Sequence, residues 1–193
     1  SIKTIVGENL PSTNYIEVYP SHTPPQGSKS DAWILRGTTT HVRYTERTEV
    51  DELKTRQPEL NRPEATYAAL IPIRKNEQWW EMSQDERRNI FEKESGHISN
   101  SMKYLPAIAR RLYHCRELGE SFDFLTWFEF APQHSSLFDE LLAQMRSSRE
   151  WQFVDREIDI RLKLKEALLR YCELDTMAMC FLVEGMMRLN QQD

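Results

Sequence analysis

Glycine is scarce in this chain. The 193 residues include six glycines, and neither a G-x-x-x-x-G-K-S run nor a G-x-G-x-x-G run occurs. P-loop enzymes and Rossmann dehydrogenases need such glycines, because the backbone must approach a phosphate closely. An H-E-x-x-H motif is also missing, which removes the main signal of the zinc proteases. Three large enzyme classes are therefore not favoured.

Long apolar runs and basic runs are absent as well. The longest apolar stretch extends from Met177 to Val183, far short of the roughly 20 residues that a membrane-spanning helix needs. The formal net charge is −5, and lysine and arginine form no cluster in the sequence. An acidic chain without a basic patch is a poor ligand for nucleic acid. We expect neither a membrane nor a nucleic-acid partner.

Cysteine is rare and unpaired in number. None of the three cysteines forms a C-x-x-C, and an odd count of this kind is typical of a reducing compartment. No secretory signal opens the chain at Ser1, although a cleaved or trimmed leader stays open. We expect a cytoplasmic protein. The C-x-x-C-H motif of c-type haem attachment is also missing, which excludes covalent attachment of that kind.

A capped helix is predicted to begin at Ser83. Ser83 and Glu86 form a capping box, in which each side chain accepts a hydrogen bond from the backbone of the other residue. Apolar residues then recur at spacings of three and four, which places His97 on the apolar face of this helix. It lies on the same face as Ile90 and next to Ile98. Neutral imidazole is a common metal ligand. A lone histidine on such a face is, however, more often a hydrogen-bonded core residue.

A strand with an inward arginine follows thirteen residues after His97. Alternation over Ile108 to Cys115 puts Arg110 and His114 on one side and Cys115 on the other. His114 and Cys115 therefore cannot share a proton as a nucleophile and its base. A buried guanidinium requires an anionic partner or a ligand, because its charge is costly to bury alone. No adjacent acid supplies one.

The remaining pattern predicts an α+β fold. Residues 1–30 are expected to form a proline-rich arm with one strand at Tyr15 to Tyr19, residues 31–164 the main domain, and residues 165–193 a helical extension. In the helix expected at Ser135 to Met145, the apolar stripe is interpreted as core. The other expected elements are a short helix or loop at Val50–Thr55 before Gln57 and strands at Ala32–Thr45, Thr66–Lys75, Ile108–Glu117, Ser121–Phe130 and Glu150–Leu162.

Six blocks of residues follow one another in a characteristic order: Ala69–Lys75, Trp79–Met82, Asp85–Arg88, Leu105–Arg110, Phe122–Glu129 and Glu150–Arg161. Together they resemble the chlorite dismutase family, closest to its short-chain, dimeric lineage. The resemblance extends from about Asp31 to Leu164. It implies a ferredoxin-like dimeric α+β barrel with antiparallel sheets, helices on the outside, an abbreviated first half and haem within the barrel.

The same resemblance implies a site for non-covalent haem b. His97 becomes the iron ligand, with Glu150 accepting its other ring N–H, and Arg110 becomes the distal cation, which Gln57 restrains. A carboxylate behind the imidazole makes it a stronger iron ligand. Each of these residues also has a purely structural interpretation. Lys75 is then a solvated lysine at the end of a strand, and Trp79 and Trp80 are ordinary core residues. The residues implied to surround the haem, near its propionates or in its pocket, are Lys75, Trp79, Trp80 and Ile71.

The implied function is conversion of chlorite to chloride and dioxygen, with Arg110 holding hypochlorite while the O–O bond forms. Two alternatives stay open. Relatives that decarboxylate coprohaem share the superfamily, but their distal position is typically not arginine. The chain is alternatively a haem carrier or sensor without turnover.

Overall fold

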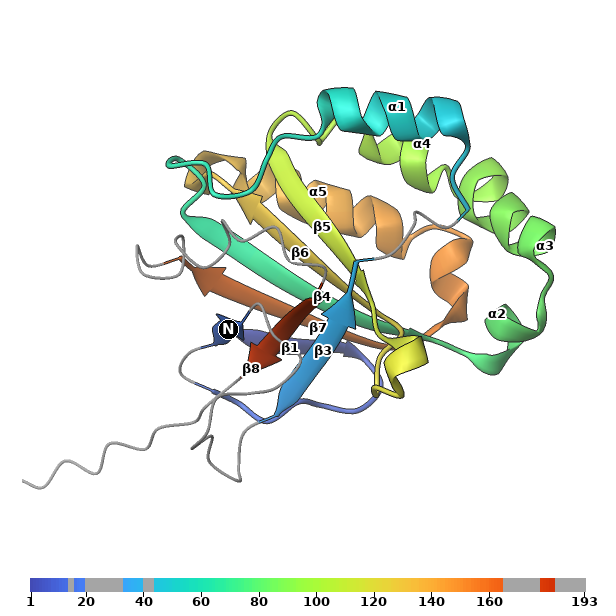
Figure 1. Ribbon diagram of the computed structural model, residues 1–193, viewed down its shortest axis with the longest axis horizontal. Coiled ribbons are helices and arrows are strands. Elements are labelled where there is room, and N and C mark those ends of the chain that lie inside the picture. The colour runs from blue at the N-terminus through green and yellow to red at the C-terminus, as the bar shows by residue number, and fades with distance from the viewer. Residues whose placement is uncertain (14–15, 20–32, 40–43, 165–177, 183–193) are drawn as a thin grey trace, which may run out of the picture.

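The computed structural model describes residues 1–13, 16–19, 33–39, 44–164 and 178–182. Within these residues, eight strands form one antiparallel sheet in the order β1-β7-β4-β6-β5-β3-β8-β2 (Figure 1). The strands are β1 (Ile2–Val6), β2 (Glu17–Tyr19), β3 (Ile34–Thr38), β4 (Tyr67–Lys75), β5 (Ile108–His114), β6 (Phe124–Phe130), β7 (Val154–Lys163) and β8 (Ala178–Leu182).

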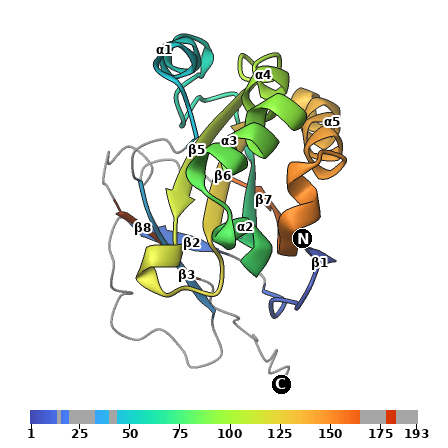
Figure 2. The same ribbon diagram turned by 90° about the vertical axis from the view of Figure 1, so that its right-hand side faces the viewer.

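Helices cover one face of the long central strands. Figure 2 shows α3, α4 and α5 together on one side of β4, β5, β6 and β7, with α1 beyond α4. No helix among the described residues is long and apolar enough to cross a membrane. The helices are α1 (Arg47–Arg56), α2 (Glu77–Glu81), α3 (Gln84–Arg88), the π-helix Asn89–Glu94, α4 (His97–Ser101) and α5 (Ser135–Arg146), with 3-10 turns at Arg116–Leu118, Pro132–His134 and Glu150–Phe153.

Alternation along the strands creates two apolar layers. In β6, Phe128 faces the helices, whereas Leu125 and Trp127 face the opposite layer, which is enclosed by the curl of the sheet. The predicted alternation of β5 is confirmed, because His114 faces the helix side and Cys115 is fully buried in the opposite layer. Burial also raises the pKa of the Cys115 thiol. The paired-nucleophile interpretation of His114 and Cys115 is therefore excluded.

The helix predicted from Ser83 is not continuous. Its capping box is present, but α3 ends at Arg88, a π-helix follows, and the chain turns at Gly96 before α4 begins at His97. Gly96 has φ +60°, a left-handed conformation that glycine adopts without steric cost. A π-turn inserts an extra residue and shifts the face that follows it. The prediction of one long helix was therefore wrong, and His97 opens a separate short helix.

Both flanking regions contribute strands to the sheet. In the arm, β2 confirms the strand expected near Tyr15 to Tyr19, but β1 was not predicted and pairs with β7. In the tail, the helical prediction was wrong for 178–182, which form β8 between β3 and β2. A short apolar run is compatible with either a helix or a strand. Here the run forms a strand because the edges of β2 and β3 are available for pairing. The remaining tail, 165–177 and 183–193, and the arm segment 20–30 lie outside the described residues, as does Cys172.

Other predicted elements hold with shifted ends. The strand expected from Glu150 begins only at Val154, because Glu150–Phe153 form a 3-10 turn. The strand expected over Ala32–Thr45 is shorter among the described residues, where β3 extends only from Ile34 to Thr38. The hairpin of β5 and β6, the helix α5 and the helix α1 before Gln57 are confirmed.

Candidate functional site

A cavity lies between the helix-facing side of the sheet and the helices α4 and α5. Its empty space is about 1150 Å³, open solvent at its mouth included, and its walls are mostly apolar. Small-molecule sites commonly have such apolar walls with a few polar groups. The resemblance implied a ligand inside the barrel, but the enclosed side of the sheet is filled by buried side chains. The open space among the described residues lies on the helix face of the sheet.

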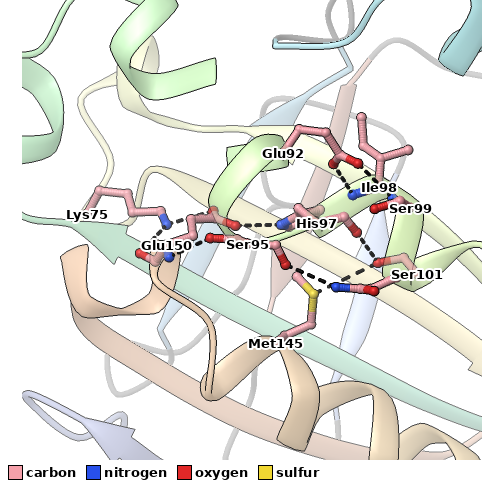
Figure 3. A network of polar contacts seen from close by, with 10 residues as sticks. Lys75, Glu92, Ser95, His97, Ile98, Ser99, Ser101, Met145 and Glu150 are labelled. Atoms are coloured by element: carbon pink, nitrogen blue, oxygen red, sulfur yellow. Dashed lines mark hydrogen bonds and ion pairs between the residues drawn. The ribbon is translucent and has the colours of Figure 1, made fainter. Parts of the chain in front are cut away.

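One wall of the cavity carries a chain of charged hydrogen bonds. Nδ1 of His97 lies 2.6 Å from Oε2 of Glu150, and Nζ of Lys75 donates to Oε1 of Glu150 at 2.7 Å (Figure 3). Lys75 and Glu150 are each only 3% exposed. Phe91 stacks on the imidazole at 4.2 Å between ring centroids. The structure thus brings His97 and Glu150 together as the resemblance implied.

This contact determines which ring nitrogen of His97 is available. With the proton on Nδ1 donated to the carboxylate, Nε2 presents its lone pair. Among the described residues, no hydrogen bond to Nε2 of His97 occurs. The imidazole is therefore oriented and made more basic for a ligand role at Nε2.

The charges stabilise Glu150 as a carboxylate. Burial alone raises the pKa of Glu150, but the nearby ammonium of Lys75 and the hydrogen bonds from Lys75 and His97 lower it to about 2. Burial lowers the pKa of Lys75, and Glu150 opposes that shift. Lys75 was expected near haem propionates. The structure instead places its ammonium on Glu150 and 4.5 Å from the centre of the Trp79 ring, because a buried cation needs a buried anion.

The turn that carries Glu150 is itself anchored. The indole Nε1 of Trp151 donates to Oε2 of Glu157 at 2.7 Å, and Nε of Arg146 donates to the other oxygen at 2.8 Å. Glu157 is fully buried in β7, and Arg146 ends α5. These bonds fix the turn to both β7 and α5, so Glu150 has little freedom to move.

Arg110 brings a guanidinium to the same cavity from β5. Its Nε is buried without a hydrogen-bond partner, and no ion pair to Arg110 occurs within the described part of the chain. Burial lowers the pKa of the guanidinium. An arginine nevertheless stays charged at neutral pH, since its ordinary pKa is above 12. The cavity therefore contains a cation without an anion, as the sequence predicted.

Gln57 is close to Arg110 but contacts its backbone. The side-chain amide of Gln57 donates to the carbonyl of Arg110 at 2.8 Å, from the C-terminal end of α1. It therefore fixes the strand at Arg110 and the end of α1 relative to each other. The expected restraint on the guanidinium is at most indirect in this geometry.

The implied surrounding residues divide into two groups. Ile71 and Trp79 line the cavity, and the buried indole Nε1 of Trp79 has no hydrogen-bond partner in the described part of the chain. Trp80 is not among the lining residues. It stacks on Phe124, and its Nε1 donates to Asp123 at 3.3 Å. Trp79 thus lies in the cavity wall, whereas Trp80 supports the wall from behind.

Sequence reasoning missed part of the lining. In α5, Phe138 is core as predicted, but Leu141, Leu142 and Met145 face the cavity. The same helical spacing serves a packed core and a ligand cavity, so the apolar pattern cannot separate the two. The interpretation of the stripe as core is confirmed for Phe138, Leu141 and Leu142, but Leu141, Leu142 and Met145 also line the cavity.

The residues fit a haem. Among the described residues, no group of three or more histidine, cysteine or acidic side chains could hold a metal ion. A single free imidazole instead suits an iron whose other ligands belong to a macrocycle. The large apolar cavity suits the porphyrin, and the unpaired donor of Trp79 suits one of its carboxylates.

Comparison with known proteins gives the same family on sequence and on structure. The family model described as chlorite dismutase matches residues 21–162. A crystal structure of a dimeric chlorite dismutase from Nitrobacter winogradskyi is 52% identical, covers 85% of this chain and 91% of that chain, and superposes with a TM-score of 0.79. A chlorite dismutase from Candidatus Nitrospira defluvii, solved with imidazole, is 25% identical with a TM-score of 0.53, over 70% of this chain and 57% of that chain.

A curated relative, the chlorite dismutase of Ideonella dechloratans, is 33% identical over 85 residues, which are 39% of this chain. The match spans only 28% of that relative. The match to the family model is far longer than this alignment. It contains His97, Arg110 and Glu150, three of the residues that line the cavity. Because sequence and fold agree over most of its length, this chain belongs to the chlorite dismutase family, a family of enzymes.

Proposed function

We propose that this chain is a haem b enzyme that converts chlorite to chloride and dioxygen. The observation that carries the proposal is one cavity with two unlike walls: an imidazole backed by a carboxylate, and an arginine without an anion. The first suits an iron ligand, and the second suits a small anionic substrate. The family match and the 52% identical dismutase support the choice of chlorite.

His97 binds the iron through Nε2 in this proposal. Glu150 keeps the proton on Nδ1, and Lys75 keeps Glu150 ionised. Trp79 donates its unpaired indole N–H to a carboxylate of the porphyrin. When bound, the haem iron supplies the redox chemistry that removes an oxygen atom from chlorite.

Arg110 attracts and retains the anions. The net charge of −5 opposes anion entry, but an unpaired cation in an apolar cavity outweighs distant, solvent-screened charges. Loss of one oxygen from chlorite leaves hypochlorite, and Arg110 holds it while the O–O bond forms and chloride leaves. One chlorite thus yields one chloride and one dioxygen. Retention matters, since escaping hypochlorite oxidises side chains such as Met145 instead.

Assembly and location belong to the same proposal. The 52% identical relative is dimeric, and we expect this chain to form a homodimer. A cytoplasmic location is supported by the odd cysteine count and by the fully buried free thiol of Cys115.

The test measures dioxygen release with an oxygen electrode after chlorite is added to the haem-loaded protein, while haem absorbance is followed in parallel. We expect fast evolution of about one dioxygen per chlorite. His97→Ala is the control and should lose haem affinity by more than the roughly 10–100-fold that loss of an outer partner costs. Haem bleaching without dioxygen would instead indicate a haem carrier or sensor. Decarboxylation of added coprohaem would indicate the third candidate.

A further inference from the structure

The helix that carries His97 is too short to hold its own position. Helix α4 has five residues, and isolated helices of this length are not stable in water. His97 is its first residue, and Gly96, the residue before it, has no side chain with which to cap the helix. The direction of the imidazole therefore depends on what binds the N-terminal end of α4.

Glu92 provides that contact from the preceding π-helix. One oxygen of its half-buried carboxylate accepts from the backbone N–H of Ile98 at 2.7 Å, and the other from Ser99 at 3.1 Å (Figure 3). These N–H groups belong to the first turn, where no intrahelical acceptor exists. A negative charge is also favourable at this positive end of a helix. Glu92 thus acts as the cap that Gly96 cannot provide.

The same segment also supports Glu150. The hydroxyl of Ser95 accepts from the backbone N–H of Glu150 at 2.8 Å, and the carbonyl of Ser95 accepts from the side chain of Asn100 at 3.1 Å. Residues 92–95 therefore hold both the helix of His97 and the turn of Glu150. The 2.6 Å contact between those two side chains depends on this common support.

We propose that Glu92 is a positioning residue that sets the strength of the bond from His97 to the haem iron. This inference rests on the haem binding proposed above, but not on chlorite turnover. Releasing the start of α4 lets His97 rotate away from Glu150 and weakens their hydrogen bond. A weaker bond at Nδ1 makes Nε2 a poorer donor to iron. Glu92 thus acts on the iron through His97 without touching it.

The experiment compares Glu92→Ala and the nearly isosteric Glu92→Gln with the wild-type haem protein. Resonance Raman of the ferrous form reports the iron–histidine stretching frequency, and transfer of haem to apomyoglobin reports the dissociation rate. In Glu92→Ala we expect a lower and broader stretching band and dissociation about 10–100-fold faster. Glu92→Gln retains one good acceptor, so its stretching frequency and its haem dissociation rate should lie between those of the wild type and of Glu92→Ala. Glu94→Ala is the matched control, because Glu94 lies on the same π-helix and contacts only Asn89 and Arg149 among the described side chains.

The outcomes separate this inference from the proposed function. An unchanged stretching band in both Glu92 variants, even with a lower melting temperature, would show a merely structural role and overturn it. An equal shift in Glu94→Ala would overturn it too, since the effect would not be specific to the cap. Wild-type protein that binds haem on His97 without releasing dioxygen would overturn the function alone. Wild-type protein that takes up no haem would overturn both.

Discussion

The two walls of the cavity differ in how completely their polar groups are paired. Around His97, every buried charge has a partner, from Lys75 through Glu150 to the imidazole. Around Arg110, the buried Nε has no partner among the described residues, and the neighbouring side chains on its face of β5, Ile108 and Leu112, are apolar. Partnered groups are rigid, whereas an unpartnered cation is ready for a ligand. The contrast fits the proposed function, in which one wall binds haem permanently and the other binds the substrate transiently.

The largest effect should follow from breaking the paired wall. Lys75→Met leaves Glu150 buried without its ammonium, which should lower the free energy of unfolding by about 3–5 kcal/mol. This free energy is measured by urea unfolding of the haem-free protein, with tryptophan fluorescence as the signal. The double variant Lys75→Met, Glu150→Gln removes the stranded charge and should recover most of the loss. A change below about 1 kcal/mol in the single variant would contradict the pairing argument.

Breaking the unpaired wall should affect catalysis and leave haem in place. Arg110→Ala should lower kcat for chlorite by about 10²–10³-fold, in line with loss of one preorganised charge donor. Stopped-flow dioxygen detection measures the rate, and the haem spectrum serves as the control. We also expect faster bleaching, because hypochlorite is held less well. Equal turnover in this variant would refute the distal role of Arg110.

The pH dependence of stability should reveal the paired wall. The folded pKa of Glu150, about 2, is below its ordinary value of 4.5, so the unfolded chain takes up this proton first. The contribution of Glu150 is complete above about pH 4.5 and is lost as the pH falls toward about 2, by at most about 1.4 kcal/mol per pH unit. Denaturation at several pH values should show a flatter curve for Glu150→Gln. Parallel curves would exclude the low pKa.

The smallest effect should come from Gln57. Gln57→Ala removes one neutral hydrogen bond to the carbonyl of Arg110, worth about 0.5–1.5 kcal/mol. We expect kcat to fall less than about tenfold, since that backbone contact does not bind the guanidinium. A loss as large as that of Arg110→Ala would show that Gln57 acts directly on the substrate or the side chain.

Local patterns predicted the separate parts of the site well. The capping box of Ser83, the alternation that turns Arg110 inward and the helix before Gln57 all depend on neighbours in sequence, and all are present. The ion pair of Lys75 with Glu150 was not predicted, for the opposite reason. Its partner Glu150 is 75 residues away, and no local pattern reveals such a pair.

The sequence by itself determined the family, the antiparallel α+β character and the inward direction of His97 and Arg110. Each of these depends on hydrophobic periodicity, helix caps or short residue motifs, which are local features of the sequence. Only the tertiary structure decided the break at Gly96, the strand β8 in place of a helix, and the position of the cavity on the helix face. It also decided that Glu92 and Ser95 support the pair of His97 and Glu150. These features depend on free strand edges, on buried charges that need partners and on helix ends that need caps. Such requirements are met only when distant segments come together.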